Sequence, residues 1–132
     1  MYRIGVQLGF SAAHYHGGGD PACDRIHGHN YRVELEIASN TLKSGMVIDF
    51  KRVRRRADDV LQEYDHCLLN ESPDFRGIEP TTENISRILY EKIKPFFSRG
   101  PARIHRITVW ETNDCWASYE EGEGGESVVS DQ

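Results

Sequence analysis

The chain has 132 residues, of which 38% are hydrophobic and 28% are charged. This length suits one domain with a modest core, and without any run of about 18 apolar residues the sequence predicts no membrane-spanning helix. The residues after Met1 lack the apolar stretch of a secretory signal, so we expect a cytoplasmic protein. Its three cysteines, an odd number, favour reduced thiols over a disulfide framework.

The net charge of −5 comes from one segment of the sequence. Residues 120–132 hold five acids and no base, so residues 1–119 are neutral overall. The acidic segment is rich in glycine and has too little apolar surface to offset the entropy of ordering it. We therefore expect one folded domain over residues 1–119 and a disordered acidic tail over residues 120–132.

Two segments alternate between apolar and polar residues, as half-buried strands do. In the first segment, residues 2–16, the even positions from Tyr2 to Ala12 are apolar, and in the second, residues 30–39, the odd positions from Tyr31 to Ile37 are. His14 continues the inward-facing positions of the first segment, and His27 and His29 continue those of the second if no bulge intervenes. All three histidines therefore extend the buried faces of two predicted strands.

These three histidines match the ligand set of a catalytic metal site. Three neutral imidazoles around one Zn²⁺ leave a fourth position open for water or substrate. Cys23 lies four residues before His27, after a glycine-rich loop that lets it fold back beside that position. A neighbouring metal lowers the pKa of a thiol, so Cys23 could abstract a proton from a substrate carbon.

Two other interpretations of the histidines stay open. With Cys23 as a fourth ligand the site would be closed and structural, and the protein would be a zinc-binding module without catalysis. An iron-dependent oxygenase would present two histidines and a carboxylate to its metal. Metal analysis of protein purified without chelator distinguishes iron from zinc.

Two helices are predicted after the strands. Asp49 is a suitable N-cap for a helix that runs to about Tyr64, and Thr81 or Thr82 can cap a second helix that ends near Lys94, before a proline. The first helix carries a run of basic residues. Because no aromatic residues are interleaved with them, they indicate a solvated face rather than a nucleic-acid surface.

Two further strands complete the predicted fold, over about 103–112 and 115–119. The order ββααββ is an α+β arrangement, which we expect to form a four-stranded antiparallel sheet with two helices on one face. Glu111 falls on the apolar face of the third strand, where a carboxylate is costly to bury unless something pairs with it. Either the strand end reaches water, or Glu111 binds a ligand with adjacent N–H donors, such as an aminopyrimidinone.

Asp65 and His66 directly follow the first predicted helix. A histidine at a helix C-terminus is commonly a favourable charge or a packed residue. Next to a carboxylate, and with a thiol and a metal site in the same chain, it suits general acid–base chemistry. For Cys67 and Cys115 we expect inert thiols.

Five motifs at consistent spacing, spread over residues 2–119, resemble the 6-pyruvoyltetrahydropterin synthase family. The three-residue gap between the cysteine and the His-Gly-His motif is similar to that of the bacterial 6-carboxytetrahydropterin synthase branch, in the queuosine (7-deazapurine) pathway. The motifs are Phe10-Ser11-Ala12-Ala13-His14, Cys23-x₃-His27-Gly28-His29, Asp65-His66, Thr81-Thr82-Glu83-Asn84 and Trp110-Glu111-Thr112.

The resemblance implies a zinc-dependent lyase that converts 7,8-dihydroneopterin triphosphate into 6-carboxy-5,6,7,8-tetrahydropterin with loss of triphosphate and acetaldehyde. Formation of the pyruvoyl product, or cleavage of the side chain of the same substrate, is the alternative within the family. It implies zinc on His14, His27 and His29, proton abstraction by Cys23 with Asp65 and His66 as acid–base partners, and a pterin ring held by Glu111 with Thr81 and Thr82.

The resemblance also implies the tunnelling fold, in which trimers close a barrel and two trimers stack as a hexamer. A barrel removes the exposed edges of a four-stranded sheet, which is a physical reason for so small a chain to oligomerise. The implied sites lie between subunits, so that the zinc and Glu111 could come from different chains. Neither nucleic acid nor membrane is an expected partner.

Overall fold

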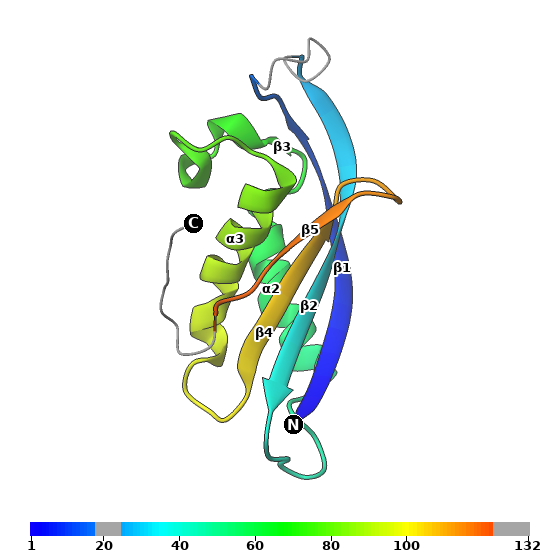
Figure 1. Ribbon diagram of the computed structural model, residues 1–132, viewed down its shortest axis with the longest axis vertical. Coiled ribbons are helices and arrows are strands. Elements are labelled where there is room, and N and C mark those ends of the chain that lie inside the picture. Colours follow the sequence, from blue (N-terminus) through cyan, green and yellow to red (C-terminus); the bar gives the residue numbers. More distant parts are fainter. Residues whose placement is uncertain (18–24, 123–132) are drawn as a thin grey trace.

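The computed structural model describes residues 1–17 and 25–122, so Cys23 and residues 123–132 of the predicted tail lie outside the described residues. Figure 1 shows one twisted sheet with both α-helices on the same side. The elements in chain order are β1 (Tyr2–His14), β2 (His27–Ser39), α2 (Phe50–Leu61), β3 (Cys67–Leu68), α3 (Thr82–Ile93), β4 (Arg103–Trp110) and β5 (Trp116–Tyr119), with short 3-10 helices at Leu69–Glu71, Pro73–Phe75 and Lys94–Phe97.

β1 and β2 form a long antiparallel hairpin. Tyr2 pairs with Ser39 at one end and His14 pairs with His27 at the other, in one continuous register. Because this register is continuous, the alternation seen in the sequence is kept along both strands, and the apolar positions of each strand from Val6 and Tyr31 onward are buried on one face.

The sheet contains a fifth strand that the sequence pattern did not predict. Its order is β3-β1-β2-β4-β5, and β3 lies parallel to β1, where it pairs with Ala12 and Ala13. The prediction of a four-stranded antiparallel sheet was therefore wrong. Two residues are too few to show an alternating pattern, and the chain enters β3 through His66, whose φ of 60° is rare for a residue other than glycine.

Both helices begin at predicted N-cap residues, the second at Thr81, one of the two threonines proposed for it. The side chain of Asp49 accepts a hydrogen bond from the backbone N–H of Lys51 at the start of α2. Thr81 caps α3, where its hydroxyl oxygen accepts from the backbone N–H of Asn84. α2 ends at Leu61 rather than near Tyr64, because hydrogen-bonded turns replace its last predicted turn.

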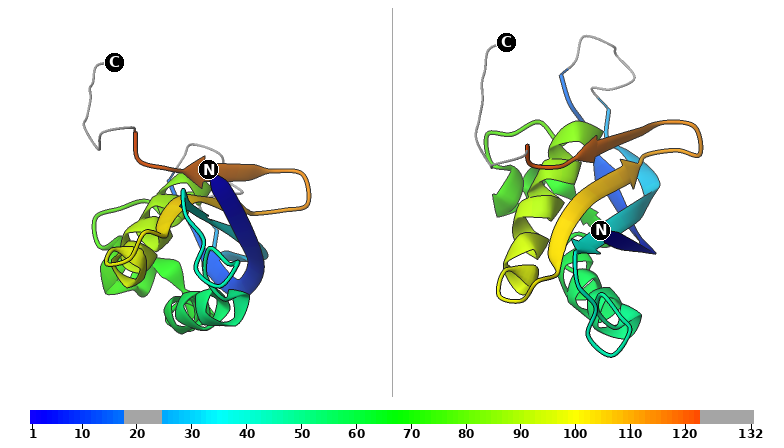
Figure 2. Two further views of the ribbon diagram at one scale, coloured as in Figure 1. Left: turned by 90° about the horizontal axis from the view of Figure 1, so that it is seen from below. Right: turned by 60° about the horizontal axis from the view of Figure 1, so that its bottom comes forward.

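The two helices cover one face of the sheet, as Figure 2 shows from two further directions. Their apolar sides pack on the inward-facing residues of β1, β2 and β4 to form a single hydrophobic core. Among the described residues, no helix has the length and apolar character needed to cross a membrane. The principal contributors to the core are Phe10, Tyr31, Leu35, Ile37, Val53, Tyr64, Ile85, Leu89, Ile93, Ile107 and Val109.

The opposite face of the sheet carries polar residues that pair across the strands. Nε of Arg106 lies 3.1 Å from Oε2 of Glu36 and 3.5 Å from Oε1 of Glu120. Glu121 also approaches the fold, with one oxygen 2.8 Å from Nζ of Lys94 at the end of α3. The first two residues of the predicted tail therefore make ion pairs with β4 and the helix layer.

Candidate active site

The three predicted metal ligands meet at one end of the β1–β2 hairpin. His14 ends β1 opposite His27, which begins β2, and His29 lies opposite Ala12. Residues two apart on a strand point to the same side, so the three rings face one another. One ring nitrogen of each histidine lies within 4.8 Å of the other two.

Backbone carbonyls fix the direction of two of these rings. Nδ1 of His14 lies 2.7 Å from the carbonyl oxygen of Pro80, and Nδ1 of His27 lies 2.8 Å from that of Arg25. A carbonyl only accepts, so each Nδ1–H donates and each Nε2 keeps its lone pair. Metal-binding histidines are commonly oriented by a second hydrogen bond of this kind.

Burial favours the uncharged form of His14 and His29, which is the form that binds a metal. The side chain of His14 is 1% exposed, and burial is the main cause that lowers the pKa of both His14 and His29. In the described part of the chain their Nε2 atoms are buried without a hydrogen-bond partner. Because a buried lone pair without a partner is costly, and three neutral imidazoles are a typical set for catalytic zinc, these residues fit a zinc ion.

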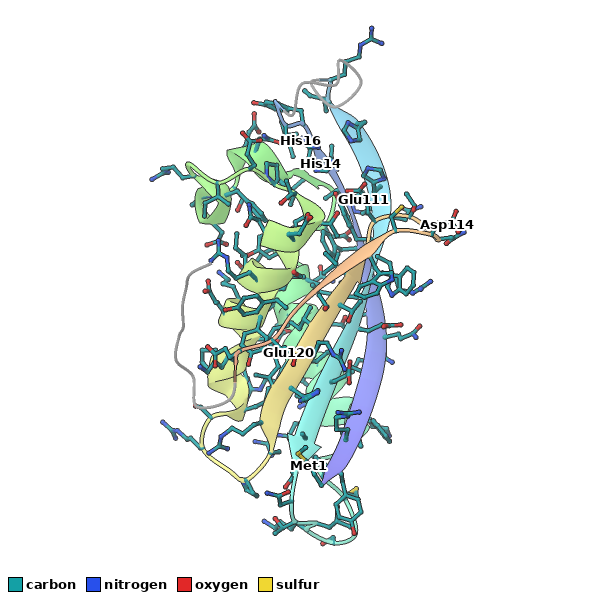
Figure 3. All side chains as sticks on the ribbon, viewed as in Figure 1. Met1, His14, His16, Glu111, Asp114 and Glu120 are labelled. Atoms are coloured by element: carbon teal, nitrogen blue, oxygen red, sulfur yellow. The ribbon has the colours of Figure 1, made fainter. Side chains whose placement is uncertain are left out.

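Glu111 lies beside this centre within the same chain. Its Oε1 is 4.0 Å from Nε2 of His14, and its Oε2 is 3.8 Å from Nε2 of His29. The Thr82 hydroxyl donates a 2.8 Å hydrogen bond to Oε1, and the backbone N–H of Glu111 donates to the Cys115 carbonyl. The carboxylate therefore presents hydrogen-bond acceptors directly next to the three clustered histidines. Figure 3 shows His14 and Glu111 at the same end of the sheet, opposite Met1.

The two threonines predicted to line the pocket have different environments. Thr82 is the first residue of α3 and contacts Glu111, so it orients the predicted ligand-binding carboxylate. The Thr81 hydroxyl oxygen is occupied with capping the same helix. The start of α3 therefore lies at the site, where the Thr81 hydroxyl caps the helix and the Thr82 hydroxyl donates to Glu111.

Asp65 and His66 form a pair on the β3 side of β1. Nδ1 of His66 lies 3.1 Å from Oδ2 of Asp65, which is within ion-pair distance when the imidazole is charged. The backbone N–H of Ser11 donates a 2.9 Å bond to Oδ1, and this bond is the main cause that holds the pKa of Asp65 below its usual range. The His66 side chain is 83% exposed. Such a pair suits proton transfer to a group that arrives from outside the chain.

An open depression of about 460 Å³ lies beside His66 and reaches His29, one of the three clustered histidines. His66 and Cys67 line it from the β3 side, and Ala13, His29 and Asn30 line it from the hairpin. Among the residues that the structure describes, no hydrogen bond or ion pair joins Asp65 or His66 to the three histidines or to Glu111. One chain thus brings together His14, His27, His29, Glu111 and Thr82, and leaves the Asp65–His66 pair facing outward.

Sequence reasoning did not find three features of the site. The carbonyls of Pro80 and Arg25 orient two rings, and backbone carbonyls have no residue-type signature. The third is Tyr31, whose ring lies 5.5 Å from that of His29. Its place two residues after His29 on the same strand face was a signal for it. Cys23, the predicted base, lies outside the described residues.

The fold and the site together define an α+β protein with a three-histidine centre, flanked by a glutamate, at one end of a mixed sheet. The family model described as 6-pyruvoyl tetrahydropterin synthase matches residues 3–122. A solved structure of the 6-pyruvoyl tetrahydropterin synthase of Caenorhabditis elegans is similar, with a TM-score of 0.78 and 27% sequence identity over 92% of this chain and 96% of that one. The chain belongs to the 6-pyruvoyl tetrahydropterin synthase family.

Relatives within the family carry more than one name. A protein of Archaeoglobus fulgidus, provisionally named 6-carboxy-5,6,7,8-tetrahydropterin synthase, is 36% identical over 86% of this chain and 91% of its own length. The 6-carboxy-5,6,7,8-tetrahydropterin synthase of Synechocystis is 32% identical over 90% of this chain and 93% of its own length. The dihydroneopterin monophosphate aldolase of Pyrococcus furiosus is 33% identical over 69% of this chain and 75% of its own length.

Proposed function

We propose that this protein is a zinc-dependent lyase that converts 7,8-dihydroneopterin triphosphate into 6-carboxy-5,6,7,8-tetrahydropterin, a step of queuosine biosynthesis in the cytoplasm. The relatives named for this activity support the choice within the family. The observation that carries it is the position of Glu111, whose carboxylate lies 3.8–4.0 Å from two of the three clustered histidines. A molecule held by Glu111 would thus have its neighbouring atoms at the metal centre.

The proposed reaction balances without an external oxidant. One water is consumed, triphosphate leaves with cleavage of a carbon–oxygen bond, and a carbon–carbon bond breaks to release acetaldehyde. The first side-chain carbon becomes the carboxylate carbon, and the two electrons that the side chain as a whole loses reduce the dihydropterin ring to the tetrahydro level. Proton transfer at carbon is therefore the chemistry that the protein must supply.

Each site residue has a role in this proposal. His14, His27 and His29 would hold the zinc, which when bound would polarise the oxygens of the substrate side chain. Glu111 would accept hydrogen bonds from the ring N–H and the exocyclic amine, which lie side by side on a pterin. Its hydrogen bond from Thr82 would fix the carboxylate for that contact. The predicted roles of Cys23 as base and of Asp65 and His66 as its acid–base partners are retained as proposals.

We further propose that the working site is shared between chains of an oligomer that closes the sheet into a barrel. In the described residues β3 pairs with β1 at Ala12 and Ala13, which leaves the edge of β1 from Tyr2 to Ser11 available to another strand. The exposed His66 would then serve the histidine centre of a neighbouring chain.

Mixing two inactive variants tests the shared site. We expect His27→Ala and His66→Ala to be inactive alone and to regain activity after they are unfolded and refolded together, because some sites then combine an intact centre with an intact His66. Refolding each variant separately is the control. Mixed oligomers confirmed by native mass spectrometry that stay inactive would show that each chain uses its own Asp65–His66 pair.

Product analysis tests the proposed reaction. With 7,8-dihydroneopterin triphosphate, we expect 6-carboxytetrahydropterin and acetaldehyde in equal amounts, measured by mass spectrometry and aldehyde trapping. The similarity to an aldolase that acts on dihydroneopterin monophosphate makes side-chain cleavage the second candidate. A C2 aldehyde fragment that still carries the triphosphate, in place of acetaldehyde, would identify cleavage, and a pyruvoyl product without any aldehyde would identify simple elimination.

A further inference from the structure

Five buried side-chain atoms lack a hydrogen-bond partner in the described part of the chain, and they fall into two groups. Arg32 Nε and Trp110 Nε1 belong to side chains that stack on each other at 4.6 Å. The other three are His14 Nε2, His29 Nε2 and the Tyr31 hydroxyl. A metal ion accounts for the two histidine nitrogens. The tyrosine hydroxyl is left, and a phenol is not among the usual ligands of zinc.

Tyr31 lies beside the three clustered histidines. Its ring is 5.5 Å from that of His29 and 6.1 Å from that of His14, and it stacks on Phe10 at 5.0 Å. Arg32 pairs with Trp110 in the antiparallel β2–β4 ladder, so the next position along each strand sets Tyr31 beside Glu111. The Tyr31 side chain is thus enclosed by the residues of the proposed site.

A buried hydroxyl without a partner destabilises a fold, so its presence calls for a reason. Tyr31 is 2% exposed, and a phenylalanine would fill the same core position without burying an unpaired polar atom. The chain also shows the ordinary arrangement, because Tyr64 is equally buried and its hydroxyl donates a 2.6 Å hydrogen bond to Asp74. The two tyrosines are therefore similarly buried, but only the hydroxyl of Tyr64 has a hydrogen-bond partner.

We propose that Tyr31 is a ligand-binding residue, whose hydroxyl donates a hydrogen bond to an acceptor oxygen of the molecule that Glu111 holds. This inference rests on the proposed function. Glu111 accepts and Tyr31 donates, so together they select a ring that presents N–H groups next to a carbonyl oxygen. The hydroxyl is unpaired until that molecule binds, whereas the two histidine nitrogens are satisfied by the metal ion.

The matched pair Tyr31→Phe and Tyr64→Phe tests this inference. For Tyr31→Phe we expect unchanged zinc content, an unchanged or higher Tm without ligand, and an approximately tenfold higher Kd for neopterin in a fluorescence titration. A tenfold change is 1.4 kcal/mol, within the usual range for one hydrogen bond. Tyr64→Phe should show the reverse pattern, a lower Tm and an unchanged Kd, because its hydroxyl is already paired inside the protein.

Two results would overturn the inference while leaving the proposed function intact. One is an equal neopterin Kd in wild type and Tyr31→Phe. The other is a lower Tm of Tyr31→Phe with an unchanged Kd, which would show that an internal water pairs with the hydroxyl. If the wild-type protein binds zinc but not neopterin, the proposed function fails, and the inference fails with it.

Discussion

Glu111→Gln is the substitution that tests the proposed pocket most selectively. The amide has the shape of the carboxylate but replaces one acceptor with an N–H donor, which would face a donor of the pterin. The Thr82 hydroxyl donates to Oε1, so we expect glutamine to turn its carbonyl oxygen toward Thr82 and its amide nitrogen toward the ligand. The amide orientation that keeps the hydrogen bond from Thr82 therefore places an N–H donor against the N–H donors of the ligand.

The expected loss follows from two hydrogen bonds to a charged group. Each contributes roughly 1.5–3 kcal/mol, and a buried unmatched donor costs a comparable amount. A loss of about 3 kcal/mol, at about 1.4 kcal/mol per decade, raises the Kd at least about 100-fold. Zinc content should stay near one per chain, because the carboxylate oxygens lie 3.8–4.0 Å from the histidine nitrogens and three imidazoles hold the metal.

Isothermal titration with neopterin, together with metal analysis of the same samples, measures both quantities. Glu91→Gln is a suitable control, because Glu91 pairs with Arg87 on the exposed side of α3 and should not affect the Kd. A neopterin Kd within threefold of wild type for Glu111→Gln would show that another residue anchors the ring. A loss of zinc in that variant would make Glu111 a metal ligand.

Three further outcomes are expected. His27→Ala should lower bound zinc well below one per chain by metal analysis, and full occupancy would exclude the histidine centre. Cys23→Ala should keep zinc and neopterin binding while kcat falls by about 100-fold or more, whereas loss of zinc would indicate a closed structural site. The Tyr64 hydrogen bond, with help from Lys92, holds the pKa of Asp74 below its usual range, so Asp74 stabilises the fold above about pH 4 and loses that contribution as the pH falls through its lowered pKa. Asp74→Asn should therefore lower the free energy of unfolding in urea by about 1 kcal/mol at pH 7 and by progressively less below pH 4, and an equal loss at pH 7 and pH 2 would refute this assignment.

The parts of the fold that follow from local pattern were predicted well. Alternation located β1 and β2, and the short polar side chains of Asp49 and Thr81 marked both helix starts. The alternation also predicted that His14 and His27 extend the buried faces of the two strands, and they lie opposite each other because the hairpin keeps one register to its end. Periodicity is a property of neighbouring residues, so it is visible in a sequence.

The features that sequence did not show depend on contacts between distant segments. β3 is two residues long and is defined by its pairing with β1, and the carbonyl of Pro80 reaches His14 from the segment that leads into α3, which packs on β4. The same packing sets Thr82 against Glu111, 29 residues away. That Tyr31 has an unpaired hydroxyl is likewise a property of the packed core, because the neighbours of a side chain are known only once the chain has folded.

Zinc titration into metal-free protein, with 7,8-dihydroneopterin triphosphate as substrate and mass spectrometry of the product, tests the central claim most directly. We expect no turnover after chelation, a rate that rises with added zinc and reaches its plateau at one zinc per chain, and 6-carboxytetrahydropterin as the product. Undiminished turnover by the metal-free protein, or a plateau at the same zinc ratio in His14→Ala, would contradict a zinc-dependent reaction at the three-histidine centre.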